Sequence, residues 1–278
     1  MKRILVPCDF SRAAEEAFHF ATKIVGKHAS EIHLLYVIDS SLANNSASEL
    51  SHVANFNGVF MERMEAELQE KLQALKTKYG AEHISISLSI ELGLLSQNIE
   101  RYIKEEKIDV VAMGTNGASG LKEIFVGSNT EKIVRKAKVP VVAVPLGSST
   151  EVISNIVFPV DPAEDPSNYL KELRFIQNLF KSKLQILWIN TPNIFKSDTE
   201  ALNDLREFAE EYQLRDYKLN VRSDYTEQEG ILTFAAGISG ALIFMPTHGR
   251  AGLAHWLTGS ITENVVNHVQ SPVWTCSI

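Results

Sequence analysis

The amino-acid sequence predicts an α/β protein of two tandem, doubly wound domains, each with a five-stranded parallel sheet. The chain repeats itself: residues 2–9 resemble residues 154–161 at an offset of 152, and residues 109–113 match residues 241–245 at an offset of 132. In both copies, short apolar runs alternate with segments of helical periodicity. Runs that are apolar at consecutive positions are typical of parallel strands covered on both faces, and right-handed crossovers between them give a doubly wound sheet.

Five strands and the helices between them are expected in the first copy. The strand-length runs are Ile4–Val6, Ile32–Val37, Ile84–Ile90, Val110–Met113 and Val141–Val144. Helical spacing marks residues 13–25 and 94–103. Because the offset falls from 152 to 132, the first copy holds about 20 additional residues between its second and third runs. Apolar residues there recur every three or four positions, which predicts a helix with one apolar stripe: Met61, Met64, Leu68, Leu72 and Leu75.

A short polar segment joins the two copies. Gly147–Thr150 follows the fifth apolar run and has the composition of a linker. We therefore predict two domains, residues 1–147 and residues 148–278. The fifth runs of the two copies, residues 141–144 and 273–277, are expected at sheet edges that pair with each other or with another chain.

Charge and composition exclude several classes of protein. Lys and Arg number 27 against 34 Asp and Glu, a net charge of −7, so no basic surface for nucleic acid is expected. No apolar run approaches the ~18 residues of a membrane span, and Asp9 ends the apolar start too early for a signal peptide. Two cysteines, Cys8 and Cys276, make neither a disulfide framework nor a zinc site. We therefore expect a cytoplasmic protein that binds neither membrane nor nucleic acid.

The candidate site lies at the carboxyl edge of the first sheet, where ligands of open parallel sheets bind. Asp9 follows the first strand, Val37 ends the second, and Met113 ends the fourth. A glycine-rich stretch comes next: Gly114-Thr115-Asn116-Gly117, nine residues, then Gly127-Ser128. Glycine leaves room for a ligand near backbone N–H groups, and a helix opening at Ser128 would direct its positive end at a phosphate. Without a Gly-Lys-Ser/Thr sequence, this is not a Walker loop.

Each of these features also has a purely structural interpretation. Ser128 with Glu131, and Ser260 with Glu263, have the spacing of a capping box. Isolated glycines mark turns, and an aspartate after a strand is typical of a turn or cap, as Asp9 would be. Three independent elements at one sheet edge favour a ligand site over these interpretations.

The glycine pattern resembles a known nucleotide-binding motif. Gly-x2-Gly-x9-Gly-Ser after an apolar strand resembles the motif of the ATP-binding branch of the universal stress protein family. Val6–Ser11 resembles that family's opening strand and turn, and Lys138–Val141 resembles its last strand. The resemblance covers nearly the whole chain, twice. It implies a tandem protein of two Rossmann-like or flavodoxin-like domains that acts as a sensor or regulator in the stress response.

The resemblance implies that the first domain binds ATP, with Mg²⁺ or Mn²⁺. Asp9 would meet the ribose or adenine, and the backbone near Val37 would border the adenine. The glycines would make space around the ribose and phosphates, and the start of the following helix would bind phosphate oxygens. Ala118 stands where many relatives carry a basic residue, which removes one cation from these contacts. The implied nucleotide-binding residues are Asp9, Val37, Met113, Gly114, Gly117, Gly127, Ser128 and Asn129.

The corresponding site in the second copy is degenerate. Pro246 replaces the first glycine, and proline both fixes φ and removes an N–H donor. Pro162 also follows the aspartate, where the first copy has Phe10. We expect weak or no nucleotide binding here. The residues of this second site are Asp161, Gly249, Arg250, Gly259 and Ser260.

The sequence can also be compared with functions other than a nucleotide sensor: an enzyme, a metal site, a receiver domain and a scaffold. The sequence shows no general base, nucleophile pair or arginine finger for catalysis, which leaves slow ATP hydrolysis or autophosphorylation as the enzymatic alternatives. His248 and His255 lack a third metal ligand. A receiver domain would need acidic neighbours beside Asp9. A nucleotide-free scaffold, which acts through an unidentified protein partner or as a homodimer, is the main alternative to the sensor.

Overall fold

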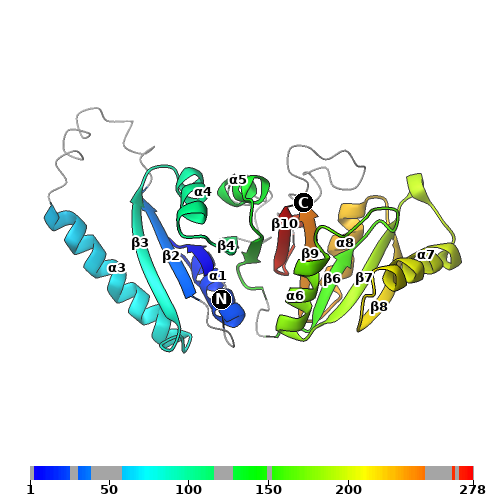
Figure 1. Cartoon of the computed structure of the whole chain (residues 1–278), viewed down its shortest axis with the longest axis horizontal. Coiled ribbons are helices and arrows are strands. Elements are labelled where there is room, and N and C mark those ends of the chain that lie inside the picture. The colour runs from blue at the N-terminus through cyan, green and yellow to red at the C-terminus, as the bar shows by residue number, and fades with distance from the viewer. Residues whose placement is uncertain are drawn as a thin grey trace. The chain divides into compact units, whose positions relative to one another are not determined.

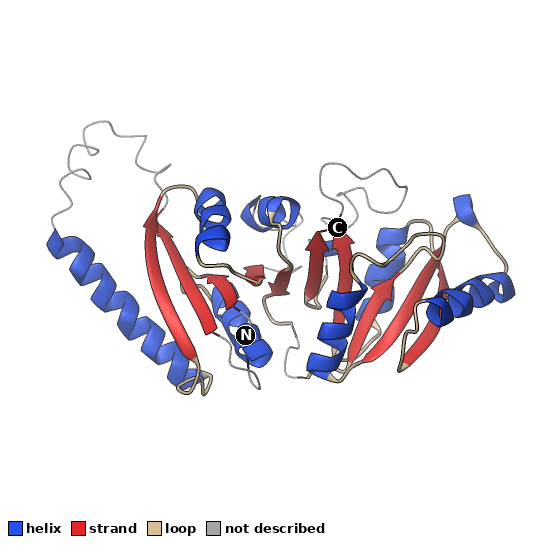
Figure 2. Cartoon of the chain, in the orientation of Figure 1, coloured by secondary structure: helices blue, strands red, loops and turns tan. Residues whose placement is uncertain are grey.

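The computed structural model describes residues 3–25, 31–38, 58–115, 128–148, 152–247, 265–266 and 269–277 (Figure 1). The chain divides into two compact units, Met1–Gly114 and Thr115–Ile278. Each unit is a sheet covered by helices (Figure 2), as the alternation of apolar runs and helical segments predicted. The α/β class and the doubly wound topology are therefore confirmed.

The first unit contains four parallel strands in the order β3-β2-β1-β4. The strands are β1 (Arg3–Pro7), β2 (Glu31–Ile38), β3 (Ser85–Leu92) and β4 (Val110–Thr115). The helices are α1 (Arg12–Val25), α3 (Gly58–Lys78) and α4 (Leu95–Glu105). Helix α3 is the inserted helix that the spacing predicted, and Leu68, Leu72 and Leu75 of its apolar stripe are buried.

The second unit contains six strands in the order β5-β10-β9-β6-β7-β8. The strands are β5 (Val141–Pro145), β6 (Asn155–Pro159), β7 (Lys183–Asn190), β8 (Tyr217–Ser223), β9 (Ala241–Thr247) and β10 (Val273–Ser277). The helical elements are α5 (Ser128–Lys136), α6 (Leu170–Phe180), the short 3₁₀ helix η2 (Pro192–Ile194), α7 (Asp198–Glu211) and α8 (Glu227–Ala236). Each copy of the repeat thus contributes five strands, as predicted.

The fifth strands of the two copies pair with each other. In this antiparallel pair, Val142 of β5 lies opposite Trp274 of β10, and the hydroxyl of Thr275 donates to the Val141 carbonyl at 3.0 Å. Trp274 is fully buried. The predicted pairing of the fifth runs is therefore confirmed. The pairing also explains why the second compact unit includes the last strand of the first copy. The predicted domain boundary between residues 147 and 148 stays a prediction.

Burial along the strands follows from their consecutive apolar residues. Ile4, Leu5 and Val6 of β1 are all fully buried, as are Ile156, Val157 and Phe158 of β6. Strands covered on one face alone would bury every second residue, so helices must cover both faces. In the described ranges, no helix combines the length and the apolar character needed to cross a lipid bilayer.

Candidate functional site

The first unit has a topological switch point between β1 and β4. The chain adds β2 and then β3 on one side of β1 and returns to place β4 on the other side. In open α/β sheets, ligands bind in the crevice beyond the carboxyl ends of the two strands at such a point. The candidate residues of the first copy follow these strand ends.

Strand register brings the predicted residues to one edge. Pro7 of β1 lies opposite Leu35 of β2, so Asp9 and Val37, each two residues further along, reach the same level. The pairing of Leu5 with Val111 likewise places Met113 level with Pro7. Asp9 is exposed, Val37 is half-buried and Met113 is buried. Asp9, Val37 and the end of β4 therefore lie at the same edge of three adjacent strands, β2, β1 and β4.

The turn after β1 orients Asp9 and starts α1. The Asp9 carboxylate accepts a hydrogen bond from the Ser11 backbone N–H at 2.9 Å, and the Ser11 hydroxyl accepts one from the Ala14 N–H at 3.3 Å. Ser11 is therefore the N-cap of α1. Phe10 between them has a φ of 60°. The structural interpretation of Asp9 as a turn residue is confirmed, and this hydrogen bond uses Oδ1 of its carboxylate.

Gly114 is required by the packing of α1 against β4. A Cβ atom at this position would lie 2.0 Å from the Ala13 carbonyl oxygen and 2.8 Å from the Ala14 nitrogen. Any side chain would therefore push the first turn of α1 away from the end of β4. Its role resembles that of the dinucleotide-fold glycine that permits close contact between helix and strand.

The predicted phosphate contacts lie largely outside the described residues. Gly117 and Gly127 of the first copy fall there, and so do Gly249, Arg250, Gly259 and Ser260 of the second. Ser128 and Asn129 are the first residues of α5, so a helix does begin where the capping-box spacing placed one. α5 belongs to the second compact unit, and the roles of these residues stay predictions.

Three residues that sequence reasoning missed lie beside Asp9 and Val37. The rings of Phe10 and Tyr36 are 6.4 Å apart, centroid to centroid, and the Lys71 ammonium lies 6.0 Å from the centre of the Phe10 ring. A hydrogen bond from Lys71 to Glu67 raises the lysine pKa. The position of Tyr36 directly before Val37 was a usable signal. Lys71 had none, because it comes from the inserted helix α3.

The corresponding edge of the second copy is built differently. α1 begins three residues after Asp9, whereas α6 begins at Leu170, nine residues after Asp161. Asp161 accepts a hydrogen bond from the Ala163 N–H at 2.9 Å, so the turn itself is retained. The later start of α6 removes the helical turn that required Gly114 in the first copy. Pro246 can therefore occupy the equivalent position on β9.

The second copy also reverses the charge at this edge. Glu164 stands at the position of Arg12, the first residue of α1, and Asp165 stands at the position of Ala13. Burial and then the charge of Asp161 raise the pKa of Glu164. Several carboxylates at one edge repel a phosphate, because like charges in a partly desolvated site strongly oppose each other.

Both halves of the chain match one protein family. The model of the universal stress protein family matches residues 1–145 and again residues 153–277. The chain belongs to the universal stress protein family. The predicted resemblance is confirmed, and because the match occurs twice in succession, this is a tandem universal stress protein.

Relatives of this universal stress protein include single-domain and full-length matches. Universal stress protein MJ0577 of Methanocaldococcus jannaschii is 30% identical over 152 residues, which cover 51% of this chain and 94% of that protein. Universal stress protein Slr1230 of Synechocystis sp. is 23% identical over 294 residues, 99% of each chain. The crystal structure of a universal stress protein from Archaeoglobus fulgidus has a TM-score of 0.74 at 22% identity and covers 99% of this chain and 98% of its own. The last match shows that the fold is shared along the whole tandem chain.

The two cysteines of this universal stress protein are expected to react very slowly with thiol reagents. Cys8 and Cys276 are buried, and burial raises the pKa of each thiol from 9.0 to about 12. Only the thiolate is nucleophilic, so at pH 8 its concentration is about a thousandfold lower than at an ordinary thiol. Titration of the folded protein with Ellman's reagent tests this, with the protein in guanidinium as the control. Rapid release of two equivalents from the folded protein would contradict it.

Proposed function

We propose that this universal stress protein binds one adenine nucleotide, ATP, at the switch point of its first domain and acts as a sensor in the stress response. The observation that carries the proposal is that Asp9, Val37 and the end of β4 lie at one edge of three adjacent strands, next to the switch point between β1 and β4. The site would lie in a domain of residues 1–147, with residues 148–278 as the second domain. The sensor would act in the cytoplasm, as a homodimer or on a protein partner.

The described residues fit the nucleoside part of ATP. Phe10 and Tyr36 place two aromatic rings beside the edge, where a purine gains stacking energy. Asp9 presents a free carboxylate oxygen to a ribose hydroxyl, and Lys71 adds a positive charge. Bound ATP would supply the phosphates, for which the motif assigns Gly114, Gly117, Gly127, Ser128 and Asn129.

A divalent metal would have to arrive with the nucleotide. Within the part of the chain that the structure describes, no group of three His, Cys, Asp or Glu side chains is placed to hold a metal ion. Mg²⁺ is commonly bound through substrate phosphates with only one or two protein ligands. Mg²⁺ or Mn²⁺ would therefore be held mainly by the ATP phosphates in the first domain.

The second domain is proposed to bind ATP weakly or not at all. Three changes support this: Pro246 removes a backbone donor, α6 starts late, and Glu164 replaces Arg12. The first two remove N–H groups from the edge, and the third replaces a positive charge with a negative one. Asp161 retains only the turn that Asp9 makes in the first copy.

Isothermal titration should give one ATP per chain, and a matched pair of variants should locate it. Asp9→Asn keeps the Oδ1 acceptor of the turn but loses the charge, and should weaken ATP binding about tenfold, which is about 1.4 kcal/mol. Asp161→Asn makes the same chemical change in an equivalent turn and should leave the affinity unchanged. Two equivalent sites, or equal effects of the two substitutions, would contradict the proposal.

A nucleotide-free scaffold is the second candidate function, and the pairing of β5 with β10 favours it. This antiparallel pair joins strands of both copies, so the tandem chain has a structural role for its second copy without any ligand. A ligand that binds only the folded state raises the melting temperature. If saturating ATP with Mg²⁺ produces no thermal shift, the scaffold replaces the sensor.

A further inference from the structure

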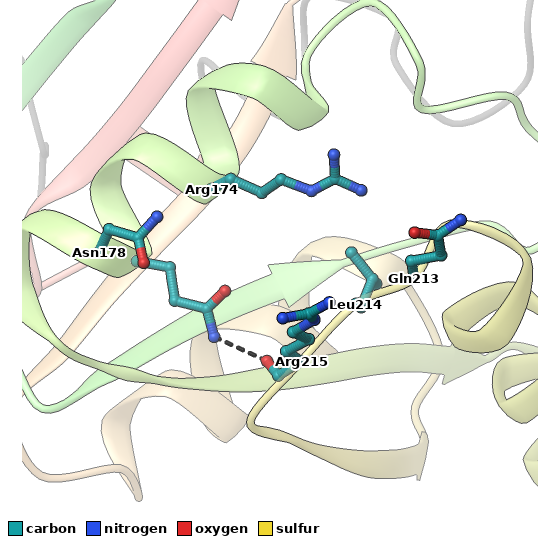
Figure 3. Close-up of a pocket in the computed structure, with 6 residues that line it drawn as sticks. Arg174, Asn178, Gln213, Leu214 and Arg215 are labelled. Atoms are coloured by element: carbon teal, nitrogen blue, oxygen red, sulfur yellow. Dashed lines mark hydrogen bonds between the residues drawn. The ribbon is translucent and has the colours of Figure 1, made fainter.

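The second unit has a polar cavity away from the carboxyl ends of its strands. It has a volume of about 330 Å³ and lies between α6 and the turn that leads from α7 into β8 (Figure 3). That turn precedes the first residue of β8, Tyr217, so the cavity lies toward the amino ends of the strands. The residues that line it are Arg174, Gln177, Asn178, Gln213, Leu214 and Arg215.

Hydrogen bonds join the two walls of the cavity, α6 and the turn before β8. The Arg174 guanidinium of α6 donates to the Tyr212 carbonyl at 2.7 Å, and the Gln177 amide donates to the Arg215 carbonyl at 2.9 Å (Figure 3). Leu214 of the turn is buried, so the turn is also held by hydrophobic packing. The turn is further shaped by Gln213, whose φ is 49°. These contacts hold α6 against the turn and fix the Arg174 guanidinium and the Gln177 amide, whereas the Arg215 side chain is exposed.

The lining carries two positive charges and no negative one. In the described part of the chain, the Arg215 guanidinium has no hydrogen-bond or ion-pair partner, and the side-chain amides of Asn178 and Gln213 have none either. Some other described arginines pair with carboxylates, as Arg3 does with Glu31 and Arg101 does with Glu91. Arg174 and Arg215 are both exposed, so their two positive charges are open to a ligand from solvent.

The first copy lacks the polar side chains of the α6 wall at the described positions. At an offset of 152, Thr22 and Val25 of α1 stand where α6 has Arg174 and Gln177, and both are buried. The turn after α3 is held by Tyr79, whose ring stacks on His19 at 4.5 Å. The arginine and the glutamine of the α6 wall therefore have no counterpart at the equivalent positions of α1.

We propose that this cavity binds a small oxyanion, the phosphate or carboxylate group of a metabolite, between Arg174 and Arg215. Guanidinium groups match the geometry of both oxyanions and form charge-assisted hydrogen bonds with them. Asn178 and Gln213 supply further neutral donors at the rim. The proposal is independent of nucleotide binding in the first domain, because every residue involved lies on α6 or in the turn before β8.

The test titrates the full chain with inorganic phosphate and, separately, with citrate at constant ionic strength. The Nε–H signals of Arg174 and Arg215 should shift and saturate in NMR spectra. Arg215→Gln should raise the apparent Kd at least tenfold without changing the fold, because the Arg215 side chain has no intramolecular partner among the described residues. Saturation with phosphate alone or citrate alone identifies the preferred oxyanion, and either supports the site.

Arg206→Gln is the matched control, because Arg206 is an exposed arginine of the same unit that donates to Asn203 at 2.9 Å. It should leave the titration unchanged. Shifts that rise linearly without saturation for both anions, or an equal loss in the Arg206 variant, would show general screening of charge and overturn the proposal.

Discussion

Gly114→Ala should destabilise the first unit by about 3 kcal/mol, at the upper end of what overpacking usually costs. The added methyl carbon would lie 2.0 Å from the Ala13 carbonyl oxygen, and backbone atoms cannot yield as a flexible side chain can. Either the first turn of α1 unwinds or β4 moves. Both outcomes also disturb the Ser11 cap and the turn that holds Asp9.

The distribution of tryptophan allows this loss to be assigned to one unit. All three tryptophans, Trp188, Trp256 and Trp274, lie in the second unit, so their fluorescence follows its unfolding by urea. Hydrogen exchange of β1 amides follows the first unit. In the variant, the backbone amides of β1 should exchange hydrogen faster. The urea concentration at the midpoint of the tryptophan fluorescence transition should not change.

Gly237→Ala is a suitable control for that substitution. Its Cβ would meet no atom closer than 3.5 Å, and its φ lies outside the left-handed region. A change of at most about 0.5 kcal/mol is expected at such a position. Equal stability of the two variants would show that the first turn of α1 can move away from β4 at little cost.

Hydrophobic pattern was sufficient to predict the strands and their order in the chain. The predicted run Ile4–Val6 lies inside β1 and is one residue shorter at each end, and Val141–Val144 lies inside β5 and is one residue shorter at its carboxyl end. The internal repeat extended the prediction to the second copy, and the drop in offset located α3. These features depend on local residue patterns, which is why the sequence alone could define them.

The detailed geometry of the edge could not be predicted, because it depends on distances between elements. Nothing in the glycine pattern indicates that Gly114 is needed for the approach of Ala13. The late start of α6 is consistent with Pro162 and Pro166 after Asp161, but the first residue of the helix has no signal, because Tyr169 precedes it without a side-chain cap. Lys71 contacts the ring of Phe10, which lies 61 positions earlier in the sequence, and no periodicity predicts such a contact.

The second large effect is expected on ATP affinity, from substitution of Gly117 in the first copy but not of its counterpart Gly249 in the second. Gly117→Val should weaken ATP binding at least about a hundredfold, or about 2.7 kcal/mol, while the chain stays folded. The resemblance places Gly117 where the ribose and phosphates approach the backbone, and two methyl groups would occupy that space. Unlike Gly114, Gly117 lies after the end of β4, so its substitution does not place an atom within the strand itself.

Gly249→Val is the internal control, because Gly249 matches Gly117 at the offset of 132. If the second edge has lost its nucleotide, as the carboxylates of Asp161 and Glu164 and the proline at position 246 indicate, the same added volume there should not change ATP affinity. Both variants are titrated with ATP, and their melting temperatures check that they fold. The pair separates a loss of space for the ligand in the first copy from a general effect of adding a valine to a glycine loop. Loss of binding in Gly249→Val alone would place the nucleotide in the second copy, and unchanged binding in both would remove the ligand from either glycine loop.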